Sequence, residues 1–180
     1  MNAPGILLFK LNGADVEAQV GETIIEVADR MGVEIPRLCY KPGMRPDGNC
    51  RACMVEIKGE RVLAPSCCRK PAAGMDVSTD SPRALHSQKL VVEMLASDVP
   101  DRVYKPDSEL DQWRRWLGIG KPRFASRAQP ASDLSHPAMA VNLDACIQCT
   151  RCVRACREEQ VNDVIGYAFR GGHSKIVFDL

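Results

Sequence analysis

The sequence lacks an excess of charge of either sign. Its 24 basic and 23 acidic side chains give a formal net charge of +1. The balance holds in each half, because residues 1–90 carry 12 basic and 11 acidic side chains and residues 91–180 carry 12 of each. Binding to nucleic acid or to an anionic membrane surface relies on clustered positive charge. The composition therefore argues against both kinds of partner.

Long apolar runs and aromatic side chains are also scarce. The longest apolar stretch, residues 90–96, is interrupted by Glu93, so no segment is predicted to cross a membrane. Residues 1–5 carry no basic side chain, and the apolar run Ile6–Phe9 is too short for the core of a signal peptide. Aromatic residues make up 5% of the chain, which excludes a large aromatic core. We therefore expect a cytoplasmic protein without membrane insertion.

The sequence contains nine cysteines, an unusually high number. The cytoplasm keeps thiols reduced, so nine thiols there hold metal more readily than they pair as disulfides. They form two groups separated by 77 residues without cysteine, which predicts two small metal-bearing units joined by a connecting region. The groups are Cys39, Cys50, Cys53, Cys67 and Cys68, then Cys146, Cys149, Cys152 and Cys156.

Strand and helix signals surround the first group. Asn12-Gly13 is a strong signal for a tight hairpin turn, and Thr23 with Glu26 forms a capping box at the start of a helix. The expected elements are a hairpin of residues 6–11 and 16–20, a helix from Thr23 to Gly32, a strand over 53–58, and short strands over 61–64 and 75–77. This pattern predicts an α+β unit over residues 1–80.

The rest of the chain is predicted to form a connector and a second unit. Residues 81–135 are expected to be a helical connector without cysteines, and residues 136–180 a ferredoxin-like segment. Trp113 and Trp116 lie one helical turn apart, a spacing typical of packing rather than of a cofactor site. The expected elements are a helix from Ser81-Pro82 to Ser97, a short helix from Ser108 to Leu117, and a hairpin of residues 164–169 and 175–178.

Ten, two and thirteen residues separate the ligand candidates Cys39, Cys50, Cys53 and Cys67. Four thiolates at these positions suit zinc or an iron–sulfur cluster. The glycine-bearing loop before Cys53 favours the cluster, since such a loop wraps an inorganic core and points N–H groups at its sulfides. A structural zinc site is the alternative, but zinc ligands usually come as two short knuckles. Spacing alone does not show whether Cys67 or Cys68 is the fourth ligand. The one that is not a ligand is expected to be a small buried hydrophobic residue.

This first group resembles the [2Fe–2S] domain of the large iron–sulfur subunit of respiratory NADH dehydrogenase. The same domain begins the catalytic subunit of NAD-dependent formate dehydrogenases and a subunit of NAD-reducing hydrogenases. The family's ligand spacing is matched by Cys39, Cys50, Cys53 and Cys67, so the resemblance selects Cys67 over Cys68. It implies a β-grasp, ferredoxin-like fold for residues 1–80.

The second group, Cys146, Cys149, Cys152 and Cys156, has the pattern C-x2-C-x2-C-x3-C of bacterial-type [4Fe–4S] ferredoxins. In two-cluster ferredoxins the last of these cysteines serves the other cluster. Cys156 therefore either closes its own cluster or serves another, in which case the fourth ligand comes from elsewhere. Arg151, Arg154 and Arg157 either raise the potential of this cluster or form a solvated helix face, with Arg154 paired to Glu158.

Residues 136–180 most resemble the NAD-dependent formate dehydrogenase branch, whose chain continues into a second cysteine run and a molybdenum or tungsten pterin domain. We therefore expect this sequence to be a piece of a longer chain. Many relatives also hold a [4Fe–4S] cluster on one histidine and three cysteines, but residues 69–145 contain no cysteine. His86 and His136 are accordingly not expected to bind metal, and His173 is expected in a turn.

Together these features predict an electron-transfer module that carries a [2Fe–2S] and a [4Fe–4S] cluster. We find no dinucleotide fingerprint, no P-loop and no nucleophile–base pair, so no catalytic residue is assigned. The resemblance implies partner subunits or domains that hold flavin and NAD on one side and a pterin site on the other. The alternatives are the iron–sulfur subunit of an NAD-reducing hydrogenase or complex I-like enzyme, and a zinc-bound interaction module.

Overall fold

The structure is a computed structural model, and it describes residues 5–99 and 108–178. Its contacts divide the chain into two compact units. The first comprises residues 1–40 and 45–91, and the second comprises residues 41–44 and 92–180. The predicted boundaries at residues 80 and 135 remain a prediction. In the described part of the chain, no helix combines the length and hydrophobicity that a membrane span requires.

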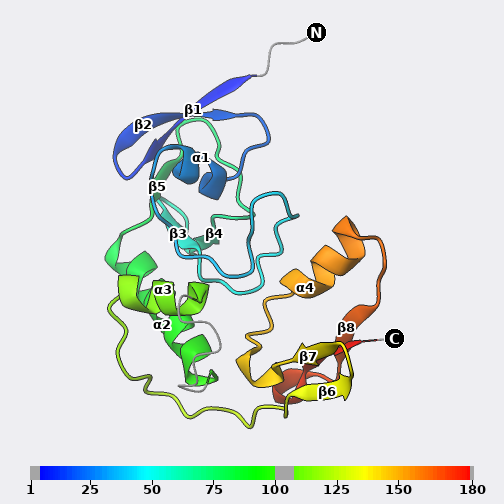
Figure 1. The fold of residues 1–180 in the computed structure, drawn as a ribbon. Helices are drawn as coiled ribbons and strands as arrows, with labels where there is room; N and C mark the ends of the chain where they lie inside the picture. Colours follow the sequence, from blue (N-terminus) through cyan, green and yellow to red (C-terminus); the bar gives the residue numbers. More distant parts are fainter. Residues whose placement is uncertain (1–4, 100–107, 179–180) are drawn as a thin grey trace. The chain divides into compact units, whose positions relative to one another are not determined.

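A mixed five-stranded sheet organises the first unit (Figure 1). Its strands are β1 (Ile6–Leu11), β2 (Ala14–Gln19), β3 (Met54–Ile57), β4 (Ala64–Pro65) and β5 (Asp76–Ser78). They lie in the order β2-β1-β5-β3-β4, with β1 parallel to β5 and the other neighbours antiparallel. The α+β class is confirmed for this unit, and its connectivity agrees with the β-grasp prediction.

The β1–β2 hairpin turns at Asn12-Gly13, as the sequence predicts. Both residues have positive φ, 50° and 82°, which a type I′ hairpin turn requires. The Asn12 amide also binds Thr79 beyond β5, accepting from its backbone N–H and donating to its hydroxyl, each at 2.8 Å. Because the turn is so tight, pairing begins at Ala14, two residues earlier than predicted.

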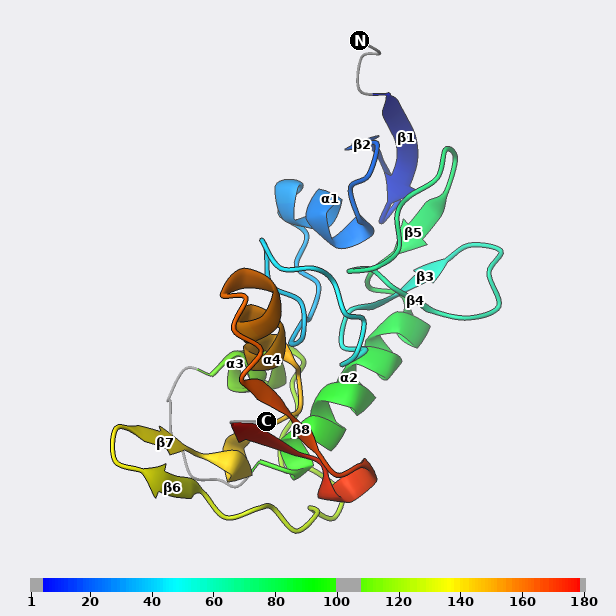
Figure 2. The same cartoon turned by 90° about the vertical axis from the view of Figure 1, so that its right-hand side faces the viewer.

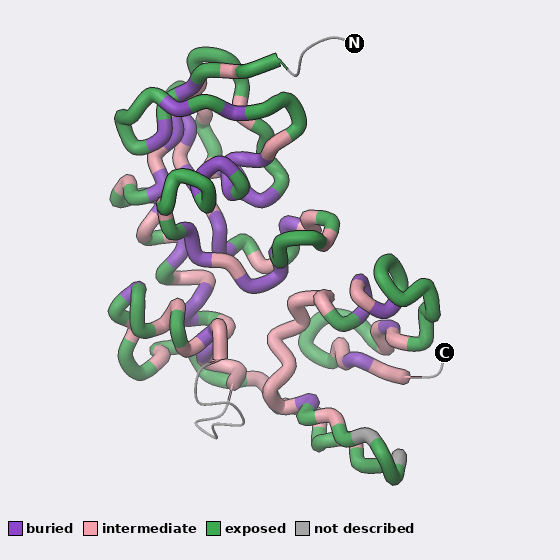
Figure 3. The backbone as a smooth tube through the Cα atoms, turned by 45° about the horizontal axis from the view of Figure 1, so that its top comes forward, coloured by how far each residue is buried: buried purple, intermediate pink, exposed green. Residues whose placement is uncertain are grey.

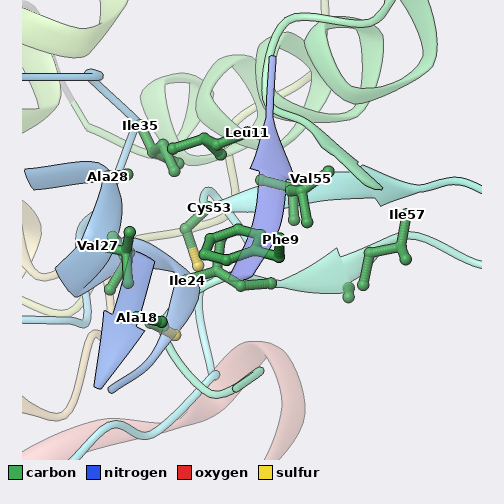
Figure 4. Close-up of a cluster of buried hydrophobic side chains, with 14 of the residues drawn as sticks. Phe9, Leu11, Ala18, Ile24, Val27, Ala28, Ile35, Cys53, Val55 and Ile57 are labelled. Carbon is green, nitrogen blue, oxygen red and sulfur yellow. The ribbon is translucent and has the colours of Figure 1, made fainter. Parts of the chain in front are cut away.

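Helix α1 (Ile24–Arg30) covers the sheet and buries four apolar side chains. The backbone N–H of Thr23 donates to the Glu26 carboxylate at 2.7 Å, so the predicted capping interaction is present. Figure 4 shows the resulting core, in which Ile24 and Val27 from the helix lie near Phe9 of β1 and Val55 of β3. The predicted short strand over 61–64 is present but shifted along the chain, because its pairing with β3 involves Ala64 and Pro65.

Helix α2 (Pro82–Ser97) begins and ends where predicted. Its Gln88 side chain is fully buried and donates to two backbone carbonyls of the first unit, Met54 O at 2.8 Å and Thr79 O at 3.1 Å. These carbonyls lie at the start of β3 and just after β5. Gln88 therefore fixes the helix to the strand next to Cys53.

The second unit consists of short elements (Figure 2). They are α3 (Glu109–Trp116), β6 (Asp133–His136), β7 (Met139–Val141), the 3-10 turns η1 (Leu143–Ala145) and η3 (Gly171–His173), α4 (Arg151–Arg154), the π-turn η2 (Ala155–Glu159), β8 (Ile165–Ala168) and β9 (Lys175–Phe178). The β8–β9 hairpin confirms the prediction, whereas the β6–β7 hairpin was not predicted. The polar residues of β6 and the adjacent Pro137 are more typical of a loop, so residues 133–136 carry no local strand signal.

Burial is sparser in the second unit than in the first (Figure 3). Its core contains Leu143, Val153 and Ile176. The prediction that both tryptophans are packed holds only in part, because Trp116 is 47% exposed. Trp113 and Trp116 instead contact one another edge to face, with ring centroids 5.7 Å apart.

Within the connector, two ion pairs join Arg123 and Arg127 to the C-terminal part of α2 and the residue after it. Arg123 donates two hydrogen bonds to the Glu93 carboxylate, at 2.7 and 2.6 Å, and its backbone N–H donates a third. The guanidinium lowers the pKa of Glu93 to about 2. Arg127 pairs with Asp98 at 3.3 Å. The connector therefore contains charged contacts that its proline-punctuated sequence did not indicate.

Replacing Gln88 with alanine should destabilise the first unit by about 2–3 kcal/mol, because the Met54 and Thr79 carbonyls each lose the hydrogen bond that this buried side chain donates. The measurement is urea unfolding followed by circular dichroism. Lys89→Ala, at the exposed neighbouring position, serves as the matched control and should change stability by about 0.5 kcal/mol at most. Equal unfolding free energies for the two variants would contradict the anchoring role.

Candidate iron–sulfur sites

The four predicted ligands of the first group meet in one place. Cys39 and Cys50 lie in the loop after α1, Cys53 directly precedes β3, and Cys67 follows β4. Their thiols form a connected set, in which Cys39 contacts both Cys50 and Cys67, and Cys67 also contacts Cys53. None of the nine cysteines forms a disulfide. Residues that are distant in sequence thus present four sulfur atoms to one site.

Backbone N–H groups support these sulfur atoms. The Cys39 N–H donates to Cys50 Sγ at 3.4 Å, and the Cys50 N–H donates to Cys39 Sγ at 3.5 Å. Arg51 has a φ of 58°, a left-handed conformation that is rare for arginine. Left-handed residues in a loop turn successive N–H groups toward one side and create a concave site for anions. Such a loop suits an anionic cluster.

The protonation equilibria show what the site requires. Hydrogen bonds from Cys50 and Cys67 lower the pKa of Cys39 to about 2, and one from Cys67 lowers that of Cys53 to about 7. The same contacts, together with burial, raise the pKa values of Cys50 and Cys67. The protein by itself therefore does not favour four thiolates. Positively charged iron would compensate their charge, so these residues fit a thiolate-ligated cluster.

The structure distinguishes the adjacent cysteines 67 and 68. Cys67 is fully buried within the thiol set, whereas Cys68 is exposed, with its Sγ 3.6 Å from Cys67 Sγ. The expectation that the leftover thiol is a buried hydrophobe is therefore wrong. Gly48 lies against Cys68, since a Cβ at position 48 would be 2.9 Å from its Sγ, so only glycine fits there without a shift.

In the second group, Cys146 directly follows η1, Cys149 lies in the loop before α4, Cys152 lies on α4 and Cys156 lies on η2. Cys152 is exposed as a residue, but partial desolvation of its thiol raises its pKa, and the nearby Cys149 and Cys146 raise that pKa further. Gln148 and Thr150, on either side of Cys149, have φ values of 55° and 64°. This loop therefore shares the left-handed backbone geometry of the first site. Cys156 is buried, and its Sγ accepts a hydrogen bond from the Val164 N–H at 3.4 Å.

Three side chains that no motif indicated hold this loop in place. The Gln148 amide donates to Ser174 O at 2.8 Å, and Arg127 donates to Cys146 O at 3.4 Å and Gly172 O at 3.3 Å. Tyr167, on β8, packs in the same apolar cluster as Cys146. Burial, with the nearby Cys146, Cys152 and Cys149, raises the pKa of Tyr167 to about 12. Sequence patterns did not reveal these residues because their partners are distant along the chain.

The arginines among these cysteines differ in environment. Arg154 is only 4% exposed, and its Nε donates to Thr150 Oγ1 at 3.1 Å. The alternative that Arg154 belongs to a solvated helix face is therefore wrong. Arg151 pairs with Glu109 of α3. Arg157 is exposed and pairs with Asp163 at 2.7 Å, as a solvated face predicts. Two of the three guanidinium groups are thus held by contacts with other residues, Arg151 with Glu109 and Arg154 with Thr150.

Two of the three histidines, His86 and His173, lie in the kinds of element that the sequence predicted. His86 is exposed on α2, and His173 ends the turn η3. His136 ends β6, where its backbone pairs with Met139. Within the two described ranges, no three His, Cys, Asp or Glu side chains form a site for a single metal ion.

The ligand assignment of the first group predicts different effects for neighbouring serine variants. Cys53→Ser should abolish or strongly shift the rhombic EPR signal of a reduced [2Fe–2S] cluster, because Cys53 is part of the buried thiol set. Cys68→Ser, the matched control at an exposed thiol, should leave the signal nearly unchanged. Loss of the signal in Cys68→Ser together with its retention in Cys67→Ser would show that the assignment is wrong.

Comparison with known proteins agrees with this geometry. Residues 7–82 match the family model of a 2Fe-2S iron-sulfur cluster binding domain. The chain is 35% identical over 150 residues to a subunit of NADH-quinone oxidoreductase from Rhizobium meliloti, an alignment that covers 79% of this chain and 18% of the relative. It is 29% identical over 180 residues to the mitochondrial NADH dehydrogenase [ubiquinone] iron-sulfur protein 1 of Solanum tuberosum. That alignment covers 97% of this chain and 24% of the relative.

A crystal structure of NAD+-reducing [NiFe]-hydrogenase in the H2-reduced state is also similar, with a TM-score of 0.86 and 27% identity. The match covers 96% of this chain and 74% of that chain. The curated relatives are far longer, since the chain spans 18% and 24% of their lengths. Residues 7–82 therefore form a 2Fe-2S iron-sulfur cluster binding domain, and the chain is homologous to this NADH-quinone oxidoreductase subunit and to the mitochondrial iron-sulfur protein.

Proposed function

We propose that this chain is an iron–sulfur electron-transfer module of a cytoplasmic NAD-linked oxidoreductase. The observation that carries the proposal is the convergence of four buried or half-buried thiols, Cys39, Cys50, Cys53 and Cys67, inside a matched 2Fe-2S domain. These four hold a [2Fe–2S] cluster, which supplies one-electron chemistry when bound. The chain itself contributes the thiolates, the N–H donors around them and the burial that sets the potential.

The second group adds a [4Fe–4S] cluster held by Cys146, Cys149 and Cys152, with Cys156 as the fourth ligand or as a ligand of another cluster. The spacing of the four cysteines and the left-handed backbone at Gln148 and Thr150 support this assignment. Two clusters in one chain allow electrons to pass from one partner subunit to another. The direction follows from the potentials of those partners.

For the parent enzyme we propose an NAD-dependent formate dehydrogenase, in which the module connects a flavin and NAD subunit to a molybdenum or tungsten pterin site. The C-x2-C-x2-C-x3-C run after a cysteine-free stretch of 77 residues supports this choice. The similarity to an NAD+-reducing hydrogenase, across 96% of this chain, favours a second candidate, a hydrogenase or complex I-like enzyme. A zinc-bound module is the candidate outside redox chemistry.

Iron and acid-labile sulfide counts on the anaerobically purified chain test the module. Six iron atoms per chain are expected if both sites are filled, two in the first cluster and four in the second. Two iron atoms would restrict the function to the first site, and five would indicate a three-iron remnant at the second. A colourless protein with stoichiometric zinc would overturn the redox function.

The parent enzyme is identified by purifying the intact complex from its host with an affinity tag on this chain. NAD+ reduction by the complex is then measured with formate and, separately, with hydrogen gas. Reduction with formate alone is the expected result. Reduction with hydrogen alone would replace the formate dehydrogenase proposal by the hydrogenase candidate, and the module function would stand.

A further inference from the structure

The Tyr167 hydroxyl is a buried polar group whose proton has no acceptor. Its Oη is inaccessible to solvent and makes no hydrogen bond within the part of the chain that the structure describes. The Thr150 N–H lies close enough to lower the pKa of Tyr167 slightly, but an N–H offers nothing for the hydroxyl proton. A buried hydroxyl without a partner costs about 1–3 kcal/mol, and native proteins rarely keep one without a reason. The unused proton therefore points to an acceptor that binds there.

The surroundings of Tyr167 identify that acceptor. The ring packs with Cys146 against the core of Leu143, Val153 and Ile176. Cys149 and Cys152 lie near enough to interact electrostatically with the hydroxyl. The residue lies on β8, and β8 pairs with β9, so the ring is carried by a hairpin rather than by a loose loop. Sulfur atoms are thus the chemical groups gathered around the unpartnered oxygen.

We propose that the Tyr167 hydroxyl donates a hydrogen bond to a sulfur of the iron–sulfur cluster held by Cys146, Cys149 and Cys152, and thereby raises its reduction potential. The inference rests on the proposed [4Fe–4S] function of this group. A reduced cluster carries one more negative charge than the oxidised cluster, so an O–H donor stabilises the reduced form more. Tyr167 is a potential-setting residue and supplies no ligand.

The hairpin also explains how the hydroxyl is positioned. Gln148 donates to Ser174 O, so the cysteine loop is tied to the start of β9. Tyr167 pairs directly with Ile176 across the same hairpin. The loop that carries the thiols and the strand that carries the hydroxyl therefore belong to one hydrogen-bonded assembly. Their separation is set by the backbone, which is the condition for a constant effect on the potential.

The test is a redox titration of the full chain, purified anaerobically, with EPR detection of both clusters. Tyr167→Phe should keep the iron count and the midpoint potential of the [2Fe–2S] cluster. The midpoint potential of the [4Fe–4S] cluster, called the second midpoint below, should become more negative. A tenfold change in the reduction equilibrium is expected, which is about 59 mV for a one-electron couple. Ile176→Val, the matched control, alters the same core without changing a polar group and should leave both midpoints unchanged.

A second measurement does not depend on the phenylalanine variant's stability. Global incorporation of 3-fluorotyrosine makes the phenol a stronger hydrogen-bond donor and should shift the second midpoint of the wild-type chain in the positive direction. Unchanged second midpoints in both experiments, with six iron atoms present, would overturn the role of Tyr167 and leave the proposed clusters standing. A wild-type chain with only two iron atoms would overturn both this inference and the second cluster.

Discussion

The crowding of four thiols in the first unit is the constraint on which the rest of that unit depends. Cys39, Cys50, Cys53 and Cys67 share hydrogen bonds in a region where burial disfavours charge. A polypeptide alone does not keep four sulfur atoms negatively charged in such a place. Iron would compensate them, so metal binding contributes directly to the stability of the fold. The sheet, the capped helix α1 and the Gln88 anchor on α2 hold the ligand-bearing segments in register.

The two units support their cysteines by different means. The first has a continuous core, in which Phe9, Ile24 and Val55 are nearly inaccessible to solvent, and Cys53 lies within it. The second has a small core around Leu143, Val153 and Ile176, and its loops depend on polar contacts such as those of Arg127 and Gln148. Both use left-handed residues beside a cysteine, Arg51 in one and Thr150 in the other. The shared backbone geometry reflects a shared need to point N–H groups at sulfur.

The two cysteine groups lie in different environments. Cys39, Cys53 and Cys67 are buried, whereas Cys152 is exposed. Arg151 and Arg154 lie close in sequence to the thiols of the second group, and Arg154 is buried. Burial, local charge and hydrogen bonds to sulfur are the means by which a protein sets a cluster potential. Each of the two sites thus combines these factors in its own way.

Sequence by itself determined the elements whose signals are local. The Asn12-Gly13 turn, the Thr23 and Glu26 cap, the extent of α2 and the grouping of the cysteines all follow from residues close together in the chain. Only the tertiary structure decided what distant segments do to one another. It left Cys68 exposed beside the buried Cys67, paired the strands β6 and β7, and buried Arg154 and the Tyr167 hydroxyl beside the second group. These outcomes depend on burial and on long-range hydrogen bonds, and spacing along the chain carries no information about either.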